Sequence, residues 1–142
     1  MDVVAGLGDL SGKLVLDVTN NIKSENGYTV PQDGPSTAQR IQMLAPNAKV
    51  VKGLNTLNIA VMANTKLGGD HVTLPIAGND KEAKAKVASI IQAMGLEAVG
   101  VGPIVAARYI EEMERMSIGS RAYSGGMDID YAIHVRGTPR AK

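Results

Sequence analysis

Short polar side chains follow three apolar segments, and their types and spacing could do chemistry. They are Thr19-Asn20-Asn21, Gly53-Leu54-Asn55-Thr56 and Gly78-Asn79-Asp80. Amide and hydroxyl groups of this kind can hold a neutral polar group, such as a carboxamide or a ribose, without a titratable catalyst. In open α/β sheets, such ligands bind outside the carboxyl ends of the strands. The same residue types also form strand-to-helix turns. For Asn20 and Asn55 the two interpretations weigh about equally, whereas Asn79 and Asp80 are better explained as helix caps.

Composition excludes several other kinds of site. The chain of 142 residues has no Cys and two histidines, His71 and His134, which lack metal-ligand spacing. We therefore expect no metal site, no thiolate nucleophile and no disulfide. The 15 basic and 14 acidic residues leave a net charge of +1, which is too small to attract nucleic acid or anionic lipid. Because no apolar stretch reaches membrane-spanning length, we expect a cytoplasmic protein with neither a nucleic-acid nor a membrane partner.

Carboxylates late in the sequence are candidates for acid and base catalysis. They are Glu111, Glu112, Glu114, Asp128 and Asp130. The three glutamates fall on the face of a predicted helix that points away from its apolar residues, where a solvated charge belongs. The sequence therefore identifies no catalytic residue.

Two glycine clusters resemble the dinucleotide-binding fingerprint without matching it. In residues 6–12 the last glycine comes one position late, and the cluster precedes a strand, whereas the fingerprint follows one. Residues 100–107 do lie between a strand and a helix. However, Val105 occupies the last small position, and Pro103 lacks the amide hydrogen that a phosphate would use. We expect both clusters to be structural turns.

The elements that must position the polar clusters alternate between strands and helices. Apolar runs predict strands at residues 13–18, 49–52, 71–77 and 96–101. Helical periodicity predicts helices at residues 37–44, 57–64, 80–94 and 103–114, of which the second follows an Asn55 cap and is the weakest. A capping box of Ser36 and Gln39 begins the first helix. Pro75 indicates an edge strand or a bulge, residues 19–35 a long loop, and residues 131–135 a final strand. This alternation predicts an α/β fold with a parallel sheet and the three polar clusters on one edge.

Four segments, taken in order, resemble one known family. Residues 12–20 are similar to the family's fourth-strand motif, with Asn21 where Pro is usual, and residues 49–56 are similar to its "VVKAFNT" segment. Residues 78–84 match its "GDDxEAK" turn and residues 102–108 its "GPLxAAR" segment. The family is the NADP oxidoreductases that act with the deazaflavin coenzyme F-420.

The resemblance implies a fold and a cofactor. The fold would be a partial Rossmann-like parallel sheet with flanking helices and a small C-terminal α+β extension. Residues 1–102 would form the second half of an NADP-binding domain, and residues 103–142 a C-terminal helix and tail. Asn20, Asn55 and Thr56 would be cofactor-binding residues near the nicotinamide. The activity implied is hydride transfer between NADP(H) and a deazaflavin such as coenzyme F-420, or a related acceptor.

The resemblance begins midway through the family's nucleotide-binding domain, so the glycine-rich half is expected to be missing. We therefore expect a weak or incomplete NADP site and leave open whether the chain is an enzyme by itself. The alternative is a non-catalytic α/β module that self-associates through a bare sheet edge or pairs with a separate nucleotide-binding half. Both hypotheses predict a homo-oligomer or a complementary N-terminal half as partner.

Overall fold

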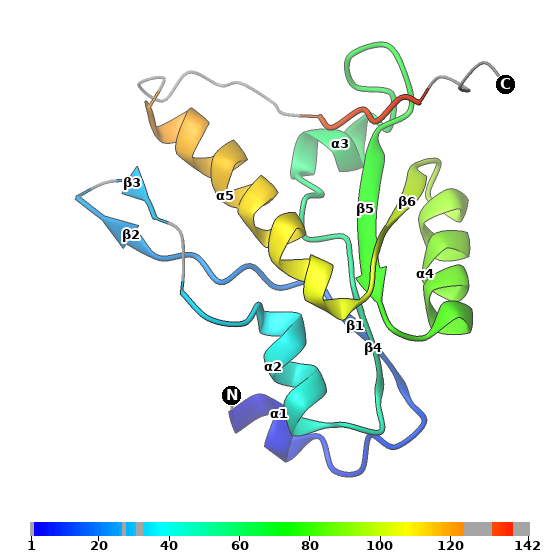
Figure 1. Ribbon diagram of the computed structural model, residues 1–142. Coiled ribbons are helices and arrows are strands. Elements are labelled where there is room, and N and C mark those ends of the chain that lie inside the picture. Colours follow the sequence, from blue (N-terminus) through cyan, green and yellow to red (C-terminus); the bar gives the residue numbers. More distant parts are fainter. Residues whose placement is uncertain (1, 27, 31–32, 124–131, 138–142) are drawn as a thin grey trace, which may run out of the picture.

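The computed structural model describes residues 2–26, 28–30, 33–123 and 132–137. Its centre is a four-stranded sheet in the order β1-β4-β5-β6 (Figure 1). The strands of this sheet are β1 (Leu14–Asp17), β4 (Lys49–Lys52), β5 (Thr73–Gly78) and β6 (Glu97–Gly102). A small hairpin pairs β2 (Ser24–Glu25) with β3 (Tyr28–Thr29). The helices are α1 (Asp2–Gly6), α2 (Thr37–Leu44), α3 (Ile59–Ala63), α4 (Lys81–Ala93), the 3-10 helix η1 (Ile104–Ala106) and α5 (Ala107–Tyr123).

Helices cover both faces of the sheet, which confirms the predicted α/β fold. One apolar core lies between the sheet and α2, η1 and α5, and it contains Ile41, Val50 and Ile110. The other lies between the sheet and α3 and α4, where Val61, Val87 and Ile91 meet the opposite face. In Figure 1, α5 and α4 accordingly flank β5 from opposite sides. Residues from both sides of the predicted boundary at 102 share the first core, and the boundary itself stays a prediction.

Local signals produce the two best-defined helices where the sequence predicts them. Ser36 accepts a hydrogen bond from the Gln39 amide, and the Gln39 side chain accepts one from the Ser36 amide, which completes the predicted capping box of α2. Asp80 caps α4 by accepting from the Ala83 amide at 2.7 Å. This bond, with the neighbouring Lys49, lowers the pKa of the Asp80 carboxyl. Gly95 ends the helix region with a φ of +80°, which only glycine adopts without strain.

The direction of β5 differs from the prediction of a parallel sheet. β1 pairs with β4, and β5 with β6, in parallel, but β4 and β5 run antiparallel through the Val51–Gly78 and Lys52–Ala77 pairs. The polar residues that follow β5 therefore lie at the opposite end of the sheet from the polar residues that follow β1 and β4. There Asp80 meets Lys49 at the start of β4, at 3.1 Å. The expectation that all three polar clusters share one edge is wrong, because the residues of a strand do not encode its direction.

Several smaller elements also depart from the sequence predictions. Asn58, and not Asn55, caps α3 by accepting from the Val61 amide at 2.9 Å. The predicted loop of residues 19–35 contains the β2–β3 hairpin. Pro75 lies in a central strand, beyond the two residue pairs that join β5 to β4, and a register irregularity follows it between Ile76 and Ala77. The missing amide hydrogen of Pro75 therefore removes no bond to β4.

Residues 132–137 lie along the part of β5 that β4 does not cover. They form no regular strand, contrary to the prediction for residues 131–135, of which residue 131 lies outside the described residues. The Thr73 amide nevertheless donates to the Ile133 carbonyl at 2.7 Å. Arg136 forms ion pairs with Asp70 at 2.6 Å and Glu97 at 2.9 Å. Its hydrogen bond lowers the pKa of Asp70, and Asp70 in turn raises the pKa of Arg136.

Among the glycines of the sheet, Gly78 has the least room for a side chain. A Cβ atom at this position would lie 2.8 Å from the Val50 carbonyl oxygen, a backbone atom that cannot rotate away. We expect Gly78→Ala to lower the free energy of unfolding by about 1–3 kcal/mol, the usual cost of overpacking a core. Urea denaturation measures this change. Gly100→Ala in the neighbouring strand β6 is the matched control, because a Cβ there meets nothing within 4 Å. Equal stability of the two variants would contradict the packing argument.

Candidate functional site

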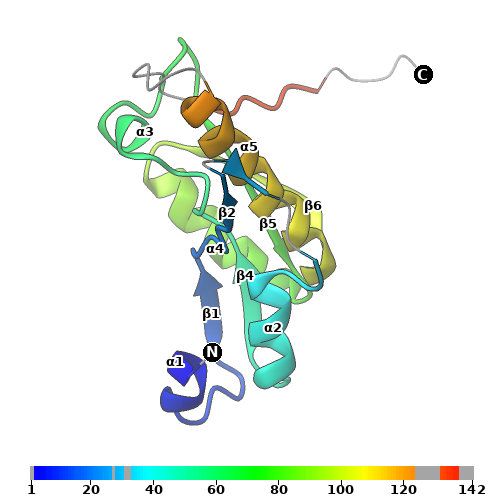
Figure 2. The ribbon, with the colours of Figure 1, turned by 90° about the vertical axis from the view of Figure 1, so that its left-hand side faces the viewer.

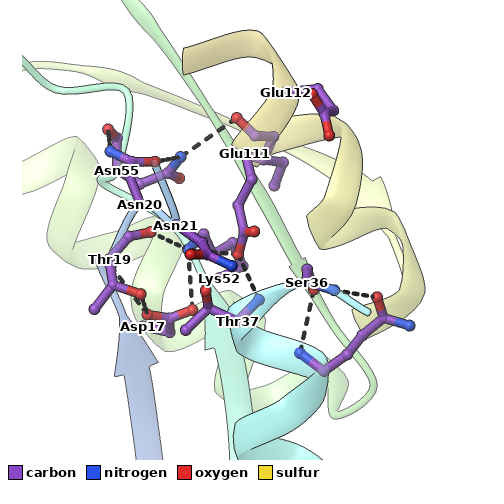
Figure 3. A network of polar contacts seen from close by, with 12 residues as sticks. Asp17, Thr19, Asn20, Asn21, Ser36, Thr37, Lys52, Asn55, Glu111 and Glu112 are labelled. Atoms are coloured by element: carbon purple, nitrogen blue, oxygen red, sulfur yellow. Dashed lines mark hydrogen bonds and ion pairs between the residues drawn. The ribbon is translucent and has the colours of Figure 1, made fainter. Parts of the chain in front are cut away.

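Two asparagines bind each other at the edge of the sheet where β1 and β4 end (Figure 3). The side-chain amide of Asn20 donates to the Asn55 backbone carbonyl at 2.8 Å. In return, the Asn55 side-chain amide donates to the Asn20 side-chain oxygen at 3.0 Å and to the Ile110 carbonyl of α5 at 3.3 Å. The structure therefore brings together two of the three predicted site residues, which are 35 positions apart in sequence.

The turn that carries Asn55 also contains two buried polar atoms without a partner. The side-chain oxygen of Asn55 and the hydroxyl of Thr56 form no hydrogen bond with any described residue, although both residues are buried. A buried unpaired polar group costs about 1–3 kcal/mol, and such a group in a folded protein requires an explanation. The Asn55 oxygen is an acceptor, and the Thr56 hydroxyl can donate or accept a hydrogen bond. A primary carboxamide offers the complementary amide hydrogen and carbonyl.

The backbone of the same turn is strained. Leu54 has a φ of +61°, in the left-handed region that costs residues with a Cβ roughly 1–2 kcal/mol. The residue before it, Gly53, is tightly packed, because a Cβ there would lie 3.0 Å from a methyl group of Ile76, which would have to shift slightly. Strained backbone persists where the surroundings hold it in place, and it is frequent at functional sites. The turn of residues 53–56 therefore has a fixed shape that brings Asn55 back towards Asn20.

Beneath the two asparagines lies a buried lysine, Lys52, the last residue of β4. Its side chain has no solvent exposure. The ammonium group forms ion pairs with Asp17 at 2.9 Å and Glu111 at 3.1 Å, and it donates to the Thr19 carbonyl. An ammonium group has three donors, and each of them has an acceptor here. We call Lys52, Asp17 and Glu111 the buried ion cluster.

The buried ion cluster connects to α2 and to the arm that precedes it. The Thr37 amide in the first turn of α2 donates to Glu111 at 2.9 Å. Arg115, one turn further along α5, lies 3.8 Å from the other Glu111 oxygen and donates to the Asn21 carbonyl at 3.1 Å. The Thr29 hydroxyl donates to the Arg115 carbonyl. In Figures 1 and 2 the β2–β3 hairpin accordingly lies beside α5. Arg115 also pairs with Glu112, which is partly exposed, so both cations of this interior have carboxylate partners.

The sequence predictions for charged residues need correction here. Glu111 is 2% exposed, so the expectation that it belongs to a solvated face of α5 is wrong. Its partner Lys52 comes from a distant strand, which the helical pattern cannot show. Sequence reasoning also missed Lys52 itself, because β4 has a lysine at each end and the sequence does not show which of the two is buried. Asp128 and Asp130 lie outside the described residues.

Other predicted features lie elsewhere or are absent from the described part of the chain. The glycine cluster of residues 6–12 forms the turn between α1 and β1, at the opposite end of β1 from Asn20, as expected. Part of it lines a hollow of about 440 Å³ against the end of α2. Within the described ranges, no group of three or more His, Asp or Glu side chains could hold a metal ion. Within the same ranges, no helix has the length and hydrophobicity needed to cross a bilayer.

The sequence matches no protein-family model, but it is similar to individual proteins. A solved structure from Arthrobacter sp. FB24, assigned as an F-420-dependent NADP reductase, superimposes with a TM-score of 0.75 at 32% identity, covering 92% of this chain and 62% of that one. A hypothetical protein from Sinorhizobium meliloti gives a TM-score of 0.63 at 30% identity, covering 75% of this chain and 53% of that one. The metalloreductase STEAP3 of Rattus norvegicus is 32% identical over 103 residues, which are 72% of this chain and 20% of STEAP3. The chain thus spans about three fifths of the first structure and one fifth of the metalloreductase.

Removing the cation of the buried ion cluster should lower the stability of the protein. Lys52→Met removes the cation and leaves Asp17 and Glu111 buried without it. Removing one partner of a buried pair typically costs about 3–5 kcal/mol, so we expect a loss of this size in urea denaturation. Lys49→Met is the control, because its ion pair with Asp80 is partly exposed and such pairs contribute little. A Lys52→Met protein as stable as the control would contradict the assignment.

Proposed function

We propose that this chain contributes the nicotinamide-binding part of an NADP(H)-dependent oxidoreductase. The observation that carries the proposal is the turn of residues 53–56, where Asn55, which is hydrogen-bonded to Asn20, and Thr56 each hold a buried side-chain atom without a partner in the described part of the chain. The nicotinamide carboxamide has the complementary donor and acceptor. The similarity to a protein assigned as an F-420-dependent NADP reductase supports the same cofactor, and the similarity to a metalloreductase supports a reductase.

The roles proposed for these residues are binding and orientation. The Asn55 oxygen would accept from the carboxamide nitrogen, and the Thr56 hydroxyl would donate to the carboxamide oxygen. Asn20 would hold Asn55 through the hydrogen bond between their side chains. When bound, NADPH supplies the hydride itself, and we propose a deazaflavin such as coenzyme F-420, or a related acceptor, as the group that receives it. No side-chain proton has to move in this scheme.

The affinity of the isolated chain should be low. Dinucleotide pyrophosphates usually bind at a glycine-rich turn that follows a strand, and the two glycine clusters of this sequence do not have that form. We propose that the phosphate contacts come from a complementary nucleotide-binding half. The chain alone would then bind NADPH mainly through the nicotinamide end.

Thr56→Val tests the proposal because it separates stability from binding. Valine has the shape of threonine without the hydroxyl, and the Thr56 hydroxyl has no partner among the described residues. We expect the variant to be as stable as the wild type or more stable, by up to about 1–3 kcal/mol. NADPH affinity should fall by about tenfold, the loss of one good hydrogen bond. A fluorescence titration with NADPH and a urea denaturation measure the two effects.

Thr73→Val is the matched control for this experiment. Thr73 is also buried, but its hydroxyl accepts from the Val135 amide at 3.1 Å, so valine should lower stability and leave NADPH affinity unchanged. Wild-type affinity in Thr56→Val would contradict the carboxamide assignment. If the wild-type chain does not respond even to millimolar NADPH, the chain is not an autonomous NADPH-binding unit.

A second candidate function is a non-catalytic α/β module that self-associates, and it is favoured by the edge strand β1. In the described part of the chain β1 pairs with β4 alone. Its residues Leu14 and Leu16 contact one core and Val15 the other, and all three remain partly exposed. Apolar residues on both faces are typical of an interior strand, and an open apolar edge invites another strand. Light scattering should therefore show a dimer or a larger oligomer, and a monomer at high concentration would contradict a shared edge.

A further inference from the structure

We propose that Lys52 is a positioning residue, which sets the geometry of the Asn20–Asn55 pair from beneath it. That this pair binds a ligand rests on the proposed function. The positioning itself concerns the free protein and can be tested without any ligand. Two acceptors of the Lys52 ammonium group, Thr19 and Glu111, adjoin Asn20 and a residue that contacts Asn55, and the third, Asp17, accepts hydrogen bonds from Thr19.

The first contact fixes Asn20. Lys52 donates to the carbonyl of Thr19, the residue directly before Asn20. Asp17, which is paired with Lys52 at 2.9 Å, accepts from the Thr19 amide at 3.0 Å and from the Thr19 hydroxyl at 2.7 Å. Thr19 is thus held at three polar groups. The backbone that follows β1 is therefore restrained, and so is the position of Asn20.

The second contact fixes the support of Asn55 on α5. Lys52 pairs with Glu111 at 3.1 Å, and the residue before Glu111 is Ile110, whose carbonyl accepts from the Asn55 side chain at 3.3 Å. The Thr37 amide donates to the same Glu111 oxygen that pairs with Lys52, which opposes rotation of the carboxylate away from Lys52. The position of Ile110 relative to β4 therefore depends on the same ammonium group.

The third link is covalent, because Asn55 follows Lys52 by three residues. The intervening turn is strained at Leu54, so its shape depends on both ends being held. Figure 3 shows the resulting arrangement, with Asn20 and Asn55 side by side, Lys52 and Asp17 below them, and the Glu111 side chain extending from α5 towards Lys52. Buried ion clusters can often be replaced by apolar residues without loss of stability. Precise positioning of Asn20 and Asn55 is a reason for the protein to retain the buried ion cluster of Asp17, Lys52 and Glu111.

The test uses a variant that removes the bridge and leaves the buried Arg115 paired with Glu112. Lys52→Met alone should be strongly destabilised, so the informative protein is the triple variant Asp17→Asn, Lys52→Met and Glu111→Gln. Amides at positions 17 and 111 can still accept from the Thr19 and Thr37 amides. The readout in the free protein is the solvent-exchange rate of the Asn20 and Asn55 side-chain amides, measured by nitrogen-15 NMR. The exchange rates of the Val87 and Ile91 backbone amides in α4 report that the fold persists.

We expect these side-chain amides to exchange at least about tenfold faster in the triple variant, as local opening becomes easier. NADPH affinity should fall by about tenfold, as expected when a ligand hydrogen bond is misaligned. The control is Lys49→Met with Asp80→Asn, which neutralises the ion pair at the other edge of the sheet and should leave both quantities unchanged.

The outcomes separate the two proposals. Unchanged exchange in a folded triple variant overturns the positioning role, whether or not NADPH binds. Faster exchange with unchanged NADPH affinity supports the positioning role and contradicts the proposed function, because the asparagines would then be mobile without consequence for the ligand. If the wild-type chain does not bind NADPH, the proposed function fails, and the exchange rates alone decide the positioning role.

Discussion

The burial of one ammonium group constrains how this chain can fold. Moving a charged amine out of water costs several kcal/mol even after the protein has relaxed around it, so Lys52 must find acceptors for all its donors. These acceptors come from the end of β1, from the backbone after it and from α5. Segments far apart in sequence therefore have to converge on the end of β4. The Asn20–Asn55 pair lies at the point of convergence.

The antiparallel pairing of β4 and β5 gives the two ends of the sheet different roles. At one end, the parallel strands β1 and β4 end side by side, which places Asn20 and Asn55 in contact. At the other end, Asp80 caps α4 and pairs with Lys49, so the polar groups there serve the helix and the strand ends. A fully parallel sheet would have placed the α4 cap at the same end of the sheet as the Asn20–Asn55 pair. The direction of a single strand thus separates the α4 cap from that pair.

The features that the sequence predicts well are those that depend on neighbours in the chain. The capping box of α2 and the cap and glycine end of α4 involve residues a few positions apart, and the structure has them as expected. The direction of β5 and the burial of Glu111 depend on contacts between distant segments, and both predictions were wrong. Asn20 and Asn55 were correctly brought together because two parallel strands end at one edge. Their role towards a cofactor remains a prediction.

The free-energy cost of forming the proposed site, from backbone strain and buried polar atoms, falls on a few residues. Leu54 is strained, and Asn55 and Thr56 hold the buried side-chain atoms that lack partners in the described part of the chain. Such a turn would relax if its ends were free, by rotating Leu54 and exposing the polar atoms to water. The buried ion cluster and the Ile110 carbonyl oppose that relaxation from two sides. A ligand that satisfies the unpartnered atoms would then recover their desolvation cost without having to order the turn, which is the physical advantage of preorganisation. A strained turn, with buried groups that have no partner in the described part of the chain, is the arrangement that the proposed ligand site requires.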